Sequence, residues 1–128
     1  MAWTSFLKNL IGSDNTAVAE PDNTTDTGAA RNENLSGRAF KKQLGEAEKA
    51  VLLDVRTGGE FSGGTIPGSK NIDFLSSTFS TNVKKLDKDA TYFVFCRSGN
   101  RSGQACKMMH KMGFDVRNLS GGIGDFPA

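Results

Sequence analysis

Apolar residues after residue 35 alternate between short continuous runs and helix-like spacing. The clearest run, at 91–95, is aromatic and β-branched without a charge, as a central strand requires. The run at 51–55 is short and apolar apart from Asp54, which is typical of a buried parallel strand near its carboxyl end. Strands are predicted over residues 51–55, 71–72, 91–95 and 116–119, and helices around Phe40 and Leu44, over 81–86 and over 102–112. The stretch 57–69 is rich in Gly and Pro and is predicted to be a series of turns. This alternation predicts an α/β sheet that binds its ligand at the carboxyl ends of the strands.

The first 34 residues differ from the rest of the chain. Apolar residues within 1–12 recur at helical spacing, which predicts a short amphipathic helix that ends at Gly12. Because this helix has one lysine, Lys8, it lacks the basic face of a membrane anchor, and we expect it to dock on its own domain or to fray. A docking element for a protein partner is the alternative. Residues 13–34 have no aromatic side chain and a net charge of −4, which predicts a flexible acidic linker. Residues 35–128 are predicted to form one domain.

Composition narrows the class of protein. A chain of 128 residues with 37% apolar and 23% charged residues fits a single globular domain. Its formal charge of +2 is too small for the basic face that nucleic-acid binding needs, although the +6 outside the acidic linker mildly favours an anionic ligand. Two cysteines are too few for a secreted disulfide scaffold and favour a reducing, cytoplasmic setting. Two cysteines and one histidine are also too few ligands for a structural zinc site. No apolar stretch reaches the roughly 20 residues of a membrane span.

The candidate chemistry lies in segment 96–102, Cys-Arg-Ser-Gly-Asn-Arg-Ser, between the strand at 91–95 and the next helix. Backbone N–H groups and the positive end of the helix dipole meet at such a junction, and both favour a thiolate over a thiol. Two arginines add positive charge, a glycine lets the backbone close tightly, and the remaining side chains offer polar groups. Cys96 is therefore predicted to be the nucleophile. The residues expected to line the ring and bind an anion are Arg97, Ser98, Gly99, Asn100, Arg101 and Ser102.

The two cysteines are interpreted differently. Cys96 could be only a small buried residue, but its place between a strand and an Arg- and Gly-containing loop argues for a reactive thiol. Cys106 falls on the apolar stripe of the following helix, so core packing is expected, with a resolving thiol as the alternative.

Four motifs, in this order along the chain, resemble the signatures of the rhodanese family. They are Leu53-Asp54-Val55-Arg56, the segment 64–69 (Gly-Thr-Ile-Pro-Gly-Ser), the cysteine loop, and the segment 119–123 (Leu-Ser-Gly-Gly-Ile). The resemblance covers about residues 35–128 and implies a five-stranded parallel sheet flanked by helices, with a persulfide formed on Cys96. Two positions depart from the family: Thr65 stands where His is common, and Phe126 stands where Trp is usual.

The resemblance implies a sulfurtransferase. The thiolate takes a sulfane sulfur from thiosulfate, a polysulfide or a low-molecular-weight persulfide, and a thiol or cyanide then removes it. Arg101 is expected to hold the anionic end of the donor. The transfer needs no general acid or base, which fits a chain whose single histidine, His110, falls in the middle of a predicted helix. We assign no cofactor and no metal.

Three charged residues near the expected site are predicted to support it. Asp54 and Arg56 end a strand next to the loop, and Arg56 with Glu60 is predicted to form a charged pair near the mouth of the site. Asp54 is expected to brace the loop, whereas bracing and donor binding are equally expected of Arg56.

Two other classes of function stay open. A non-catalytic persulfide carrier or docking module would pass sulfur to one protein partner, without fast turnover on small thiols. A phosphatase or arsenate reductase also uses a cysteine loop that ends in arginine. Tyrosine-type phosphatases, however, have five residues between the two, whereas four separate Cys96 from Arg101, and the smaller ring suits a sulfur atom better than a phosphoryl group.

Overall fold

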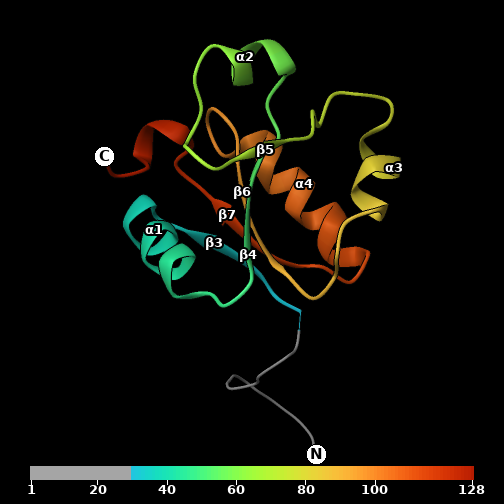
Figure 1. The fold of residues 1–128 in the computed structure, drawn as a ribbon, viewed down its shortest axis with the longest axis horizontal. Helices are drawn as coiled ribbons and strands as arrows, with labels where there is room; N and C mark the ends of the chain where they lie inside the picture. The colour runs from blue at the N-terminus through green and yellow to red at the C-terminus, as the bar shows by residue number, and fades with distance from the viewer. Residues whose placement is uncertain (1–29) are drawn as a thin grey trace, which may run out of the picture.

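The computed structural model describes residues 30–128, in which the strands form one parallel sheet (Figure 1). The strands are β3 (Asn32–Leu35), β4 (Ala50–Asp54), β5 (Lys70–Asn71), β6 (Thr91–Phe95) and β7 (Asp115–Leu119). Their order across the sheet is β3-β7-β6-β4-β5, and every neighbouring pair is parallel. The predicted five-stranded parallel sheet is confirmed.

Helices cover both faces of this sheet (Figure 1). They are α1 (Gly37–Glu46), α2 (Gly58–Ser62), α3 (Phe79–Lys84) and α4 (Asn100–Lys111), and a 3-10 turn, η1 (Ile123–Asp125), follows β7. Phe79 of α3 and Met109 of α4 belong to one apolar cluster, and Phe40 of α1 belongs to the cluster on the other face. Within residues 30–128, no helix is long and apolar enough to cross a membrane.

The central strand β6 shows why its sequence is continuously apolar. Tyr92 and Val94 point into the cluster with α3 and α4, whereas Phe93 and Phe95 point into the cluster with α1. All four are almost completely buried. A strand with helices on both faces has no solvent-facing side, so polar alternation is absent. The strand runs directly into Cys96 and thus places it at the carboxyl edge of the sheet.

Strand β3 corrects the predicted boundary of the acidic linker. Residues 32–35 pair with 116–119 of β7, so the domain begins before residue 35 and the last residues of the predicted 13–34 linker belong to the sheet. The sequence signal is weak because β3 is an edge strand with alternating exposed and half-buried side chains and one apolar residue, Leu35. The predicted helix at 1–12 and the rest of the predicted linker lie outside the described residues.

Helix α2 lies within the stretch predicted as turns. Its two leading glycines are poor helix formers and hide the helical signal. A capping box stabilises the helix instead: the Glu60 N–H donates to the Thr57 hydroxyl at 3.2 Å, and the Thr57 N–H donates to the Glu60 carboxylate at 3.1 Å. This short helix brings the Glu60 carboxylate to the carboxyl end of the sheet, beside the cysteine loop.

Candidate active site

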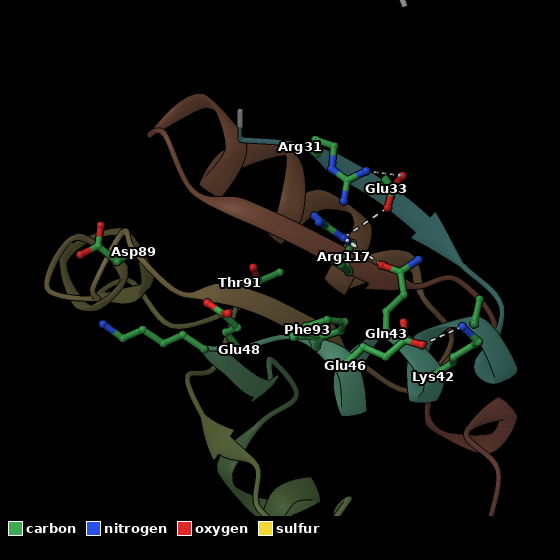
Figure 2. A pocket seen from close by; sticks show the side chains of 13 residues that line it. Arg31, Glu33, Lys42, Gln43, Glu46, Glu48, Asp89, Thr91, Phe93 and Arg117 are labelled. Atoms are coloured by element: carbon green, nitrogen blue, oxygen red, sulfur yellow. Dashed lines mark hydrogen bonds and ion pairs between the residues drawn. The ribbon is translucent and has the colours of Figure 1, made fainter. Parts of the chain in front are cut away.

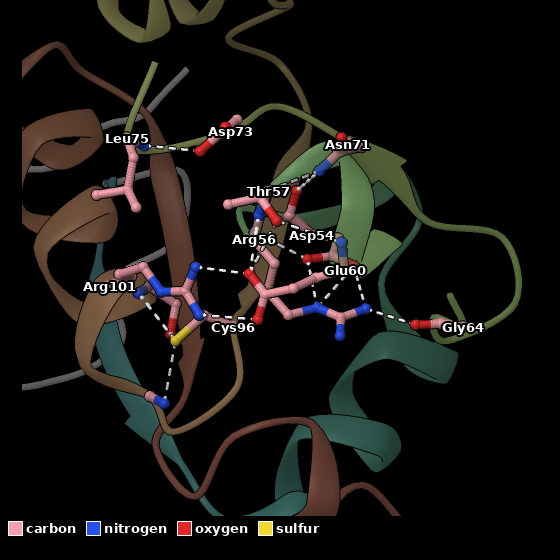
Figure 3. A network of polar contacts seen from close by, with 12 residues as sticks. Asp54, Arg56, Thr57, Glu60, Gly64, Asn71, Asp73, Leu75, Cys96 and Arg101 are labelled. Atoms are coloured by element: carbon pink, nitrogen blue, oxygen red, sulfur yellow. Dashed lines mark hydrogen bonds and ion pairs between the residues drawn. The ribbon is translucent and has the colours of Figure 1, made fainter. Parts of the chain in front are cut away.

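The sulfur of Cys96 lies inside a partial ring of hydrogen-bond donors (Figure 3). The Gly99 N–H donates to Sγ at 3.1 Å, and the N–H and the hydroxyl of Ser102 each donate to it at 3.4 Å. Cys96 itself is fully buried. Helix α4 begins at Asn100, and the first amides of a helix have no acceptor within it. Here the amides of Gly99 and Ser102 are directed at the sulfur, an arrangement that stabilises an anion.

Opposing effects set the pKa of the Cys96 thiol. Burial is the largest single effect and acts to raise the pKa, because it removes water from the thiolate. Hydrogen bonds from the hydroxyl and N–H of Ser102, and from the amides of Ser98 and Gly99, act in the opposite direction. Together they outweigh burial, so the pKa of Cys96 lies below the usual thiol value. The loop itself therefore supplies the activation of the sulfur.

Two glycines allow the cysteine loop to pack against the end of β7. Gly99 has φ +92° and Gly122 has φ +79°, a region that L side chains rarely adopt. A Cβ at Gly99 would overlap the Ser120 carbonyl, and a Cβ at Gly122 would overlap the Arg97 carbonyl. The two loops are further joined by the Ile123 N–H, which donates to the Cys96 carbonyl at 2.9 Å. The double glycine after the last strand is thus part of the site, a contact that its place in the sequence does not reveal.

Arg101 pairs with Glu60 across the mouth of the loop (Figure 3). Its Nη1 donates to Oε1 at 2.9 Å and its Nη2 to Oε2 at 3.2 Å. The hydrogen bonds from Arg101, and next the Thr57 amide, lower the pKa of Glu60 to about 2. The predicted pair between Arg56 and Glu60 is wrong. Residues two apart in extended chain face the same side, so Arg56 turns to Asp54 and leaves Glu60 to the cysteine loop.

Asp54 and Arg56 form a buried brace beneath α2. The Arg56 Nη2 donates to Asp54 Oδ2 at 2.8 Å and to the Gly64 carbonyl at 2.6 Å. The Thr65 hydroxyl also donates to Asp54 Oδ2, at 2.8 Å. This threonine, which stands where the rhodanese family commonly has His, therefore binds the brace and not the sulfur. The network joins the end of β4 to the turn that follows α2.

The other residues predicted to line the ring lie around it. Arg97 and Ser98 are exposed at the tip of the loop, although the Ser98 amide contributes to the low pKa of Cys96. Asn100 is the first residue of α4, and its side-chain oxygen accepts a hydrogen bond from the side chain of Gln104, one turn later, at 3.4 Å. Of the predicted ring, Gly99 and Ser102 contact the sulfur directly.

Cys106 and His110 lie away from this chemistry. Cys106 is fully buried in the apolar cluster beneath α4. Burial, and next the negative charge on Cys96, raises the pKa of Cys106 to about 12, so it is an uncharged thiol at neutral pH. His110 is exposed, and its Nε2 lies 3.3 Å from the carbonyl of Ala30, which precedes β3.

A groove of about 690 Å³ lies at the opposite end of the sheet from the cysteine loop (Figure 2). Its lining residues include Lys49 before β4 and Thr91 at the start of β6, which places it at the amino ends of the strands. The buried Arg117 in its wall bonds Asp115 at 2.7 Å and Glu33 at 3.2 Å. None of the lining residues is a cysteine, and the buried charge is compensated, so the candidate chemistry stays with the cysteine loop.

Known proteins similar to this chain fall into one family. Residues 36–128 match the family model described as a rhodanese-like domain. The chain is 35% identical over 89 residues to the Bacillus subtilis protein YtwF, covering 70% of this chain and 84% of that one. It is 31% identical over 90 residues to a sulfurtransferase of Allochromatium vinosum, covering 70% of this chain and 82% of that protein. The crystal structure of a rhodanese-like domain protein from Staphylococcus aureus superposes with a TM-score of 0.65 at 27% identity, covering 74% of this chain and 91% of that chain.

Proposed function

This chain belongs to the rhodanese-like family, and we propose that it carries a sulfane sulfur as a persulfide on Cys96. Its similarity to a named sulfurtransferase supports sulfur transfer at the level of the family. The observation that carries the proposal for Cys96 is the set of three donors on its sulfur, two from Ser102 and one from Gly99. Hydrogen-bond donors of this kind stabilise the thiolate before the reaction and the persulfide anion after it.

The proposed reaction has two displacements at sulfur. With thiosulfate, the Cys96 thiolate attacks the outer sulfur, a new S–S bond forms, and the bond to the sulfonate sulfur breaks with its electron pair leaving as sulfite. The enzyme is left with a persulfide anion, and the total charge of −3 is conserved. A thiolate or cyanide then attacks the outer sulfur of this persulfide, leaving with it as a new persulfide or as thiocyanate and restoring the Cys96 thiolate.

The surrounding residues take distinct roles in this proposal. Gly99 and Ser102 hold the anionic sulfur, and the exposed Arg97 draws the anionic donor toward the loop. The Asp54–Arg56 brace fixes the segment that carries Glu60. A buried ion pair of this kind acts through the position of its neighbours, so we assign both residues to bracing. We place the reaction in the cytoplasm, where a reactive thiol stays reduced.

A protein acceptor is a second candidate for the discharge step. Leu75 is 66% exposed on the segment that follows β5, and Figure 3 shows this segment near the cysteine loop. In this candidate, Leu75 supplies an apolar contact for the acceptor protein. If small thiols remove sulfur slowly from the Cys96 persulfide and one cellular protein removes it fast, a protein acceptor is favoured over a small diffusible acceptor.

The proposal is tested by intact-protein mass after incubation with thiosulfate, and separately with polysulfide. We expect the native chain and Cys106→Ser to gain one sulfur atom, about 32 Da, that cyanide removes, and Cys96→Ser to gain none. Cys106→Ser is the matched control because it removes the other buried thiol. If folded protein with reduced Cys96 gains no sulfur from either donor, the catalytic proposal is wrong.

A further inference from the structure

Arg101, the second arginine of the cysteine loop, is already paired. Both of its terminal nitrogens donate to the two carboxylate oxygens of Glu60, and both side chains are partly buried, with 24% and 30% of their surfaces exposed. Figure 3 shows the pair beside the Cys96 sulfur. A carboxylate held in this fork compensates the charge of Arg101 and takes one bidentate edge of its guanidinium, so a second anion meets a cation that is already neutralised.

Glu60 is anchored independently of Arg101. Its Oε1 also accepts from the N–H of Thr57 at 3.1 Å and from the Thr57 hydroxyl at 3.2 Å, and its own N–H donates back to that hydroxyl. The carboxylate therefore stays at the mouth of the loop as part of the helix cap. A donor that displaced Glu60 from Arg101 would leave a negative charge fixed beside its own.

The other charges around the mouth almost cancel. Arg56 is paired with Asp54. Asp73 lies close enough to Arg101 to raise the pKa of its guanidinium, after the larger effect of Glu60. Arg97, exposed at the loop tip, is then the cation of the loop that faces an arriving donor. Because the charges around the site nearly cancel, they favour a sulfur donor with one negative charge over a sulfur donor with two.

We propose that Glu60 is a positioning residue that neutralises Arg101 and so makes the chain select sulfur donors with at most one negative charge, such as low-molecular-weight persulfides, over dianionic thiosulfate. This rests on the proposed persulfide chemistry of Cys96. With a hydropersulfide RSSH, the Cys96 thiolate attacks the outer sulfur, the S–S bond of the donor breaks, and the electron pair leaves with the thiolate RS⁻. The outer sulfur and its proton stay on Cys96, so charge and atoms balance.

The test compares how two sulfur donors load Cys96 in the native chain and in the variant Glu60→Gln. Glutamine can keep the cap to Thr57 but removes the charge that neutralises Arg101. The donors are thiosulfate and the hydropersulfide of 2-mercaptoethanol, and the readout is the ratio of their kcat/KM values for loading Cys96. We expect this ratio to shift toward thiosulfate by about tenfold through a lower KM, and the shift to weaken at high salt.

Glu46→Gln is the matched control, because Glu46 forms an exposed pair with Lys42 on α1. Its donor ratio is expected to stay within about twofold of the native ratio, as surface pairs contribute little. A Glu60→Gln ratio unchanged from native, or shifted toward the hydropersulfide, would overturn the proposal. Absence of loading by either donor on the native chain would instead reject the persulfide chemistry, so the two failures are distinguishable.

The double variant Glu60→Gln/Arg101→Gln decides the question if the single variant does not fold. It replaces a neutral pair of charges by a neutral pair of amides, so the proposal predicts a donor ratio within about twofold of native. A selective loss of thiosulfate loading in this variant, with the hydropersulfide retained, would show that Arg101 binds the donor dianion despite its pairing. That result would contradict the proposed role of Glu60.

Discussion

Cys96 and Cys106 are ten residues apart and both fully buried, yet their thiols have opposite properties. Burial acts to raise the pKa of each. Around Cys96, three hydrogen-bond donors reach the sulfur. Together with the Ser98 amide they more than reverse the effect of burial. Around Cys106 the neighbours are apolar, and the pKa rises to about 12.

The difference between the two cysteines lies in the backbone and not in exposure. Cys96 ends a strand just before a helix begins, where amides have no partner within the helix. Cys106 lies inside that helix, where each amide already donates to the preceding turn. The same residue type becomes an anion carrier in one place and a small apolar filler in the other.

A side chain at Gly99, where the cysteine loop turns tightly, should slow sulfur loading more than the other changes considered. Gly99→Ala would place a Cβ against the Ser120 carbonyl at a positive φ, and the loop must shift to relieve the overlap. We expect sulfur loading of Cys96 to slow on the order of a hundredfold, with about 1–3 kcal/mol lost from the free energy of unfolding. Loading kinetics and urea denaturation measure the two effects.

Gly45→Ala is the matched control for this change. Gly45 lies in α1 and a Cβ there meets no atom within 4 Å. This variant should load sulfur like the native chain and gain about 0.5–1 kcal/mol of stability, because Ala is the better helix former. Equal loading by Gly99→Ala and Gly45→Ala would mean that the geometry of the ring is unimportant.

Removing one donor from the ring should have a smaller effect. Ser102→Ala deletes the hydroxyl that lies 3.4 Å from the Cys96 sulfur and keeps the backbone N–H. Losing this hydrogen bond should raise the pKa of Cys96, because the thiolate loses one of the groups that stabilise it. The pH profile of persulfide formation should therefore move to higher pH, and loading at pH values below the native pKa should be about tenfold slower. A profile that stays in place would exclude the hydroxyl as a contributor.

The smallest effect is expected from the buried thiol of Cys106, and it concerns the free energy of unfolding at alkaline pH. A thiol whose folded-state pKa is raised above the unfolded value of 9.0 stabilises the fold below that value, and this stability is lost as pH rises toward 12. Between pH 8 and about pH 9.7, the native chain should therefore lose about 1 kcal/mol more of unfolding free energy than Cys106→Ala. Urea denaturation at the two pH values measures the difference. Equal losses would show that Cys106 is not the neutral thiol described here.

The sequence predicts the centre of the sheet well because burial leaves a strong signal there. Strand β6 is apolar on both faces and was predictable to the residue at 91–95, and the strand-to-helix position of Cys96 follows from it. The edge strand β3 leaves little signal, since its polar residues look like the linker before them. Helix α2 is hidden by Gly58 and Gly59, and its capping box is recognisable only from Thr57 and Glu60 three residues apart.

The sequence predicts which charged residues lie near the site, but it does not predict which of them pair with one another. Asp54, Arg56, Glu60 and Arg101 all lie near the loop, but four charges allow more than one pairing. Their choice depends on α2, which directs Glu60 toward Arg101 at 2.9 Å, and on the i, i+2 spacing that turns Arg56 toward Asp54. The contact between Gly122 and the cysteine loop likewise joins residues that are far apart in sequence.

The most direct measurement is a titration of the Cys96 thiolate by its ultraviolet absorbance, taken as the difference between the native chain and Cys96→Ser. Cys106 has a pKa of about 12, so it stays protonated through the range in which Cys96 titrates and drops out of the difference. If the hydrogen-bond donors around Cys96 activate its sulfur, the difference titrates with a pKa below the usual thiol value of 9.0. A midpoint at or above that value would show that burial dominates at Cys96, as it does at Cys106, and would contradict the account.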